Sequence, residues 1–336
     1  MNAVSRISPA AARHWAIFIV ALAALVALAS AGCSGASSPA VGVEPPSPGA
    51  PAGGLDGGTL ATLRFAVVGD SRPATVDDTG GYPSDVVSRI YGDVQALTPR
   101  PSFVVSTGDY LFASEPAAGE PGQAGPQLDV YLQARARFTG PLFPAMGNHE
   151  CTGATASNCG PGASDGVTAS YAAFVSKLLG PLGVPLPYFV VDVAATDRSW
   201  TAKFVFVAAN AWSSAQAAWL DAALGRATTY TFVVRHEPAS ASTAPGVLPS
   251  EAILARHPYT LAIVGHSHTY AHSADAPREV LVGNGGAPLT SKTYGFAVFA
   301  QRADGAIVVD MFDWQTVAPD ASFHFAVSAA GVAIRP

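Results

Sequence analysis

The chain alternates apolar, β-branched runs with segments of mixed polarity from about residue 59 onward. Short apolar runs bounded by turn residues are typical of buried strands, and apolar positions at helical spacing are typical of helices. The spacing predicts helices over residues 83–97, 127–138, 169–179, 215–224 and 251–256. The apolar runs predict strands over residues 63–68, 102–106, 142–145, 188–193, 203–208, 230–234, 260–264, 279–282, 295–300, 306–312 and 323–334.

The order of these elements predicts the fold class. Strands alternate with helices over the first part of the domain, and strands dominate from residue 279 to the end. Alternating βα units followed by a strand-rich half are typical of an α/β sandwich. We therefore expect an α/β fold in which two sheets share one core.

The N-terminal 32 residues have the pattern of an export signal. Arg6 and Arg13 precede an apolar stretch over residues 15–29, and small residues stand directly before Cys33. The stretch of about 15 residues is shorter than the roughly 20 that a membrane-spanning helix needs. The pattern predicts a secretory signal peptide over residues 1–32.

The position of Cys33 resembles the cleavage site of a bacterial lipoprotein, which implies that this cysteine carries a lipid. Such an anchor would attach the exported protein to a membrane of the bacterial cell envelope. Ser30 stands where these signals usually have leucine. The alternative is ordinary cleavage that leaves Cys33 as a free thiol.

Residues 33–58 are rich in Gly, Pro, Ser and Ala and show no periodicity. Such composition is typical of a disordered tether. We expect the folded domain to span residues 59–336, a length that suits one large α/β domain with a well-filled core.

Charge and cysteine content narrow the set of partners. The formal net charge is −6 and no Lys/Arg cluster occurs, which disfavours a nucleic-acid-binding surface. Only three cysteines are present, and Cys151 and Cys159 bracket a loop of small polar residues. In an oxidising compartment this pair predicts a disulfide, with two unpaired thiols as the alternative.

Five short polar motifs each end or follow an apolar run: GDSR at 69–72, GDY at 108–110, GNHE at 147–150, RHEP at 235–238 and GHSH at 265–268. Ligand sites in open α/β sheets lie beyond the carboxyl ends of the strands. Each motif alone is as typical of a turn or a buried polar residue, but all five together predict a metal site. Oxygen and imidazole ligands without a thiolate suit hard or borderline divalent ions. The motifs supply Asp70, Asp109, Asn148, His149, His236, His266 and His268.

The order GD, GD, GNHE, strand-end His and GHSH resembles the calcineurin-like metallophosphoesterases, over residues 65 to about 300. The runs GHSHTY at 265–270 and VGNGGAP at 282–288 resemble the purple acid phosphatase branch. The resemblance implies a four-layer α/β/β/α sandwich of two mixed β-sheets flanked by helices. It also implies two divalent or trivalent metal ions, with Fe, Mn and Zn as candidates.

Carried over position by position, the resemblance implies a role for each motif residue. The implied ligands are Asp70 and His268 for the first ion, Asp109 for both ions, and Asn148, His236 and His266 for the second ion. His149 would stand beside the ions and stabilise or protonate the transferring phosphoryl group or its leaving oxygen. Glu150 has two interpretations: it orients His149, or it merely begins the loop at Cys151.

Two positions depart from the family pattern. Many members have a histidine ligand where this chain has Arg72, and purple acid phosphatases have a tyrosine ligand where it has Phe112. The first ion would then keep only three protein ligands and bind more weakly. Arg72 could take a phosphate oxygen bidentately, or it could pair with Asp77 or Asp78.

The resemblance implies a binuclear phosphoric ester hydrolase, in which a metal-bridging hydroxide attacks the phosphorus of a small phosphorylated substrate, and the predicted signal peptide implies that this enzyme is exported. We expect phosphomonoesters to be favoured, with phosphodiesterase or nucleotidase activity as the alternative on the same site. A hypothesis of a different class is a catalytically weak lipoprotein that binds metal or phosphate. Arg72 and Phe112, which vacate two usual ligand positions, motivate it.

Overall fold

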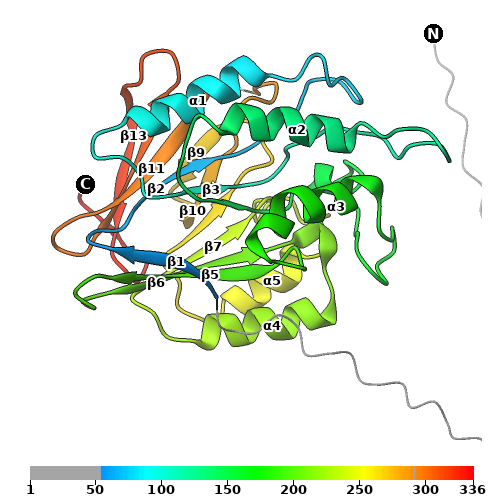
Figure 1. Ribbon diagram of the computed structural model, residues 1–336. Coiled ribbons are helices and arrows are strands. Elements are labelled where there is room, and N and C mark those ends of the chain that lie inside the picture. Colours follow the sequence, from blue (N-terminus) through cyan, green and yellow to red (C-terminus); the bar gives the residue numbers. More distant parts are fainter. Residues whose placement is uncertain (1–53, 291) are drawn as a thin grey trace, which may run out of the picture. The chain divides into compact units, whose positions relative to one another are not determined.

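The computed structural model describes residues 54–290 and 292–336. The predicted signal peptide, Cys33 and the tether as far as residue 53 lie outside the described residues. The described chain has an α/β fold with two mixed, seven-stranded sheets and helices on their outer faces (Figure 1).

The first sheet has the strand order β1-β5-β6-β7-β8-β10-β9. Its strands are β1 (Leu55–Leu60), β5 (Phe189–Ala195), β6 (Thr201–Val207), β7 (Tyr230–Arg235), β8 (Leu261–Val264), β10 (Ala276–Val282) and β9 (Tyr270–Ser273). The second sheet has the order β14-β13-β12-β11-β2-β3-β4. Its strands are β14 (Ala333–Ile334), β13 (Pro319–Val327), β12 (Ile307–Asp313), β11 (Gly295–Gln301), β2 (Arg64–Val68), β3 (Val104–Ser106) and β4 (Leu142–Pro144).

Five α-helices accompany the sheets among the described residues. They are α1 (Ser84–Ala96), α2 (Ala124–Arg135), α3 (Ala169–Phe174), α4 (Ser214–Gly225) and α5 (Val247–Leu254). Figure 1 shows α1 and α2 over the sheet that contains β2 and β3, and α4 and α5 below the other sheet. No helix in the described part of the chain is both long enough and apolar enough to span a bilayer.

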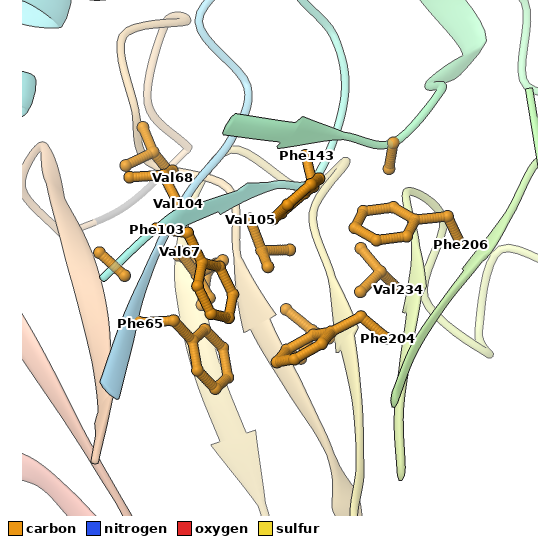
Figure 2. Close-up of a cluster of buried hydrophobic side chains, with 14 of the residues drawn as sticks. Phe65, Val67, Val68, Phe103, Val104, Val105, Phe143, Phe204, Phe206 and Val234 are labelled. Carbon is orange, nitrogen blue, oxygen red and sulfur yellow. The ribbon is translucent and has the colours of Figure 1, made fainter. Parts of the chain in front are cut away.

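Aromatic side chains from both sheets fill the space between them (Figure 2). Phe65 on β2 meets the edge of Phe204 on β6, with ring centroids 4.9 Å apart. Phe103, just before β3, contacts Phe204 at 5.2 Å. Because side chains alternate along a strand, Val205 on β6 faces the other way and packs with Trp219 of α4 in a second cluster. The two clusters of buried side chains pack against the sheets and hold them in a fixed arrangement, which determines the positions of the strand ends.

The predicted start of the domain at Thr59 is wrong by several residues. Residues 55–60 form β1, an edge strand parallel to β5, so the end of the predicted tether belongs to the domain. Its glycines permit close packing, because a Cβ on Gly57 would lie 2.7 Å from a methyl group of Val191. The glycines that made this segment resemble a flexible tether instead allow β1 and β5 to pack closely.

Other differences are local. Helix α2 begins three residues before the predicted start, and α5 begins at Val247 instead of residue 251. Strand β9 was not predicted, and the single strand predicted over residues 323–334 is split into β13 and β14 by a turn. The predicted disulfide between Cys151 and Cys159 is present.

Candidate metal centre

Five strand ends bring the predicted site residues together. Asp70, Asp109 and Asn148 follow β2, β3 and β4 of one sheet, and His236 and His266 follow β7 and β8 of the other. Strands β2, β3 and β4 are parallel, as are β7 and β8, so the carboxyl ends within each set lie at one edge. The site therefore forms where the ends of the two sheets meet.

The backbone at this edge adopts conformations that L-residues rarely occupy. Asp70, Asp109, His266 and His268 have φ angles of 59°, 59°, 73° and 48°. Left-handed backbone at non-glycine residues is uncommon and concentrates at functional sites. Main-chain hydrogen bonds hold it here: the amide of Asp70 donates to the carbonyl of Gly108 at 3.0 Å.

Glycine lets the segments approach closely. A Cβ on Gly147 would lie 2.3 Å from Oδ1 of Asp109, and a Cβ on Gly265 would lie 2.4 Å from Oδ2 of Asp70. Any larger residue would push into the carboxylates. The glycine in the GNHE and GHSH motifs therefore makes room for the acidic side chains.

Four side-chain atoms converge in what we call the His236 cluster, formed by Asp109, Asn148, His236 and His266. Nε2 of His236 lies 3.2 Å from Oδ1 of Asn148 and 3.3 Å from Oδ1 of Asp109. Nδ1 of His266 lies 3.0 Å from Oδ1 of Asn148 and 3.2 Å from Nε2 of His236. All four residues were predicted as ligands of one ion.

Surrounding hydrogen bonds determine which atoms face this cluster. Nδ1 of His236 lies 2.8 Å from the carbonyl of Thr107, which can only accept, so Nδ1 carries a proton and the other ring nitrogen, Nε2, faces inward. The amide nitrogen of Asn148 donates to the carbonyl of Gly153 at 2.6 Å, so its oxygen faces inward. Atoms at such distances share either a proton, as in a hydrogen bond, or a cation that lies between them. The cluster therefore fits a divalent ion.

Charge around His236 supports the same conclusion. Burial lowers the pKa of His236, but the carboxylates of Asp109 and Asp70 outweigh burial and raise this pKa well above its ordinary value. The protein environment thus attracts positive charge to this point, as a proton on His236 or as a metal ion.

The second group, the Asp70 cluster, consists of Asp70, Asp109 and His268. Their ligand atoms lie within 4.8 Å of one another, and Nε2 of His268 is 3.7 Å from Oδ1 of Asp70. Nδ1 of His268 lies 2.8 Å from the carbonyl of Pro288, which leaves Nε2 free to face the cluster. Burial raises the pKa of Asp70 well above its usual range, and the charge of Asp109 adds to this effect. A cation would relieve the repulsion between these buried acids.

Asp109 belongs to both clusters. Its Oδ1 lies 3.3 Å from Nε2 of His236, and its Oδ2 lies 3.8 Å from Nε of Arg72. Burial acts to raise the pKa of Asp109, but His236 and His149 hold it below the usual range. The position is the one that the resemblance implies for a bridging carboxylate. That these residues bind two ions stays a prediction.

His149 lies at the rim of the clusters. Its Nε2 is 4.0 Å from Oδ2 of Asp109, and its ring meets the edge of Phe112 at 4.5 Å between centroids. The residue is 8% exposed, and burial is the main reason that the pKa of His149 falls to about 4. An imidazole beside both clusters, but in neither, can contact a bound phosphoryl group.

Arg72 points toward the clusters. Its Nε lies 3.8 Å from Oδ2 of Asp109 and, although buried, has no hydrogen-bond partner in the described part of the chain. The guanidinium lies over the ring of Phe112, 4.8 Å from its centroid. Among the described residues Arg72 forms its ion pair with Asp109 and none with Asp77 or Asp78, whose carboxylates accept hydrogen bonds from Ser114 and Gly81 instead. Arg72 thus has donor capacity directed at the site.

Glu150 has neither of the two predicted roles. Its buried carboxylate accepts hydrogen bonds from the backbone amides of Asp109, Tyr110 and Gly147 at 2.9, 2.8 and 2.8 Å. Burial raises the pKa of Glu150 to about 7. It fixes the backbone of the GDY and GNHE motifs relative to each other.

Sequence reasoning missed Glu237. This residue is fully buried, and its oxygen atoms come within 4.8 Å of ring nitrogens of His236 and His266. Burial raises the pKa of Glu237 to about 7. The sequence feature that could have identified Glu237 is its position in the RHEP motif, directly after the candidate ligand His236.

Comparisons with known proteins give the family and the fold of the chain. Residues 63–270 match the sequence model of the calcineurin-like phosphoesterases. Comparison with curated protein sequences gives no match.

Solved structures share the fold at low sequence identity. GAP50, the anchor in the inner membrane complex of Plasmodium, has a TM-score of 0.54 and 17% identity over 80% of this chain and 89% of its own. Purple acid phosphatase PPD1 from yellow lupin (Lupinus luteus) seeds has a TM-score of 0.54 and 14% identity over 80% of this chain and 54% of its own. A dimetal phosphatase from Danio rerio has a TM-score of 0.51 and 12% identity over 80% of this chain and 99% of its own.

Proposed function

Because the chain belongs to the calcineurin-like phosphoesterase family, we propose that it is an exported, metal-dependent phosphoric ester hydrolase that favours small phosphomonoesters. One observation carries the proposal: neighbouring inward-facing atoms of the His236 cluster lie 3.0–3.3 Å apart, and Asp109 joins them to a second acidic cluster. Within the family, we place the chain nearest the purple acid phosphatase-like members, on the GHSHTY and VGNGGAP runs.

Two bound ions, of iron, manganese or zinc, would polarise the phosphoryl oxygens and activate a water molecule for attack on phosphorus. The residues around them have separate tasks. The carboxylate of Asp109 sets the spacing of the two clusters. His149 donates a hydrogen bond to the transferring phosphoryl group or to the leaving oxygen, and the negative charge of the substrate beside it raises its affinity for a proton.

Arg72 completes the site on the side of the Asp70 cluster. Its unpartnered Nε and the fixed position over Phe112 suit binding of a phosphate oxygen. The guanidinium would orient the phosphoryl group without contributing a metal ligand. This arrangement predicts a strongly held ion in the His236 cluster and a weaker one in the Asp70 cluster.

Export and lipid attachment form part of the proposal. The Cys151–Cys159 disulfide suits an oxidising compartment, and the sequence before Cys33 suits lipidation at the cell envelope. Expression of the full chain in a bacterium with a radiolabelled fatty acid tests this directly. We expect label on the wild type and none on Cys33→Ala; equal label on both would contradict the anchor.

A second candidate, a catalytically weak metal- or phosphate-binding lipoprotein, is favoured by Arg72 and Phe112 in place of two usual ligands. Assays of the purified chain on an aryl phosphate and a bis-aryl phosphate, with added Mn²⁺, Fe²⁺ or Zn²⁺, separate the possibilities. We expect turnover of the monoester, lost in Asp109→Ala and kept in the surface control Asp221→Asn. Preference for the diester would favour a phosphodiesterase, and one ion or none without turnover would favour the binding protein.

A further inference from the structure

The side chain of Glu237 is a buried carboxylate without a hydrogen bond. It is 0% exposed, and neither Oε1 nor Oε2 has a hydrogen-bond partner. Burying a carboxylate in this state costs free energy unless a compensating positive charge or donor is present. Since no described residue donates a hydrogen bond to it, the carboxylate retains the capacity to bind a cation.

The neighbouring side chain of Arg235 does not form a hydrogen bond with this carboxylate. Nε of Arg235 donates to the backbone carbonyl of Glu237 at 2.7 Å, and its two other nitrogens donate to Ser250 and Glu251, both at 2.7 Å. The guanidinium is thus used for joining β7 to α5. Besides Arg235, the charged groups that act on Glu237 are His236 and Asp109, both members of the His236 cluster.

The carboxylate and the histidines form a possible ligand set. The ligand atoms of Glu237, His236 and His266 lie within 4.8 Å of one another. The distance exceeds that between adjacent ligands of one ion, but a Glu side chain has rotatable bonds that can bring its oxygen closer. Within residues 54–290 and 292–336, no group hydrogen-bonds to its oxygens.

We propose that Glu237 is a further ligand of the ion in the His236 cluster, an inference that rests on the proposed function. The residue adds an anionic oxygen to Asp109, Asn148, His236 and His266. A fifth ligand, and one that coordinates through oxygen, favours an ion that accepts more than four ligands, such as Mn²⁺, over tetrahedral Zn²⁺. Glu237 would thereby determine which metal the site prefers.

Calorimetric titration of the metal-stripped full chain with Mn²⁺ and, separately, with Zn²⁺ tests this role. We expect Glu237→Gln to weaken Mn²⁺ binding at the tighter site by about tenfold or more, and to weaken Zn²⁺ binding less. Glu279→Gln is the matched control, because Glu279 is a nearby acid that already accepts a hydrogen bond from the amide of Ala239 at 2.9 Å. Mn²⁺ affinity equal to wild type in Glu237→Gln would overturn the proposal.

Thermal unfolding provides a second measurement that does not depend on activity. Without metal, Glu237→Gln should unfold at the wild-type temperature or above, because it removes an unpaired buried acid. Saturating Mn²⁺ should then raise its unfolding temperature less than that of the wild type. An equal rise in both would overturn the proposal, whereas a wild-type chain that binds no metal would overturn the proposed function as well. If Glu237→Gln does not fold, Glu237→Asp retains the charge and should show the same weaker Mn²⁺ binding.

Discussion

The carboxylate of Glu150 accepts a hydrogen bond from the backbone amide of Asp109 at 2.9 Å, although the residues are 41 positions apart. The same carboxylate accepts from Gly147 and Tyr110. Glu150 therefore connects the turn after β3 to the turn after β4. Through this connection it fixes the residue whose carboxylate belongs to both clusters.

Replacement of Glu150 by glutamine should weaken that connection. The amide NH₂ of glutamine cannot accept, so at least one backbone N–H is left buried without a partner, which costs about 1–3 kcal/mol of unfolding free energy. We expect weaker metal binding as well, because Asp109 loses its backbone support. Urea unfolding and Mn²⁺ titration measure the two effects. The exposed residue Glu120 provides a control, Glu120→Gln, which should behave as wild type; wild-type values for Glu150→Gln would show that the connection is dispensable.

A histidine at position 72, where many family members have a metal ligand, should change the affinity of the ion expected in the Asp70 cluster. Arg72→His places an imidazole beside the Asp70 cluster, and we expect the affinity of that ion to rise by about tenfold or more. Inorganic phosphate should bind about tenfold more weakly, because a charged hydrogen-bond donor is lost. Metal quantitation after dialysis and phosphate inhibition constants test these changes, with the exposed Arg100→His as the control. Unchanged stoichiometry and unchanged phosphate inhibition would remove Arg72 from the site.

The sequence predicts much of this site because its residues stand next to clear signals. Asp70 and His236 each follow an apolar run after one intervening residue, so the strand ends could be located and the convergence of the motifs inferred. Strand β6 is another example. Phe204 and Val205 lie on opposite faces of the strand and both are buried, as expected from an uninterrupted apolar run, which is typical of a strand covered on both sides.

The remaining features depend on contacts between distant residues. β1 has no apolar alternation, and only pairing with β5, more than a hundred residues later, makes it a strand. The partners of Glu150 are backbone amides at positions 109, 110 and 147, which carry no sequence signature. The direction of Arg72 depends on packing over Phe112. Local patterns cannot reveal such relationships.

Lys203 should make stability depend on pH. Its buried ammonium donates hydrogen bonds to the carbonyls of Ala223, Leu224 and Arg226 at the end of α4. Burial lowers the pKa of Lys203 to about 8, from an ordinary value of 10.5. Between these values the unfolded chain binds more protons than the folded chain, so the contribution of this residue to stability rises with pH.

Urea unfolding of the wild type and Lys203→Met from pH 7 to pH 9.5 tests that sign. We expect the wild-type free energy of unfolding to increase relative to the variant as the pH passes 8. The comparison at each pH cancels the titration of the other groups, which both proteins share. Parallel curves would mean that the ammonium keeps an ordinary pKa in the folded protein.

Removal of the His149 imidazole should separate catalysis from metal binding. The ring lies outside both clusters, with Nε2 4.0 Å from Oδ2 of Asp109, so His149→Ala should retain the metal content of the wild type. Loss of a proton donor to the leaving oxygen should lower kcat by about 10²–10⁴-fold. The loss should be larger for an alkyl phosphate than for an aryl phosphate, because the poorer leaving group needs the proton more.

Metal quantitation and steady-state kinetics on both substrates measure these effects together. His257→Ala is the matched control, because His257 pairs with Asp221 at 2.7 Å on the surface and should be replaceable without effect on either quantity. Equal losses on the two substrates would assign His149 to phosphoryl binding instead of proton donation. Full activity in His149→Ala would exclude both roles, and loss of an ion would place the imidazole among the ligands.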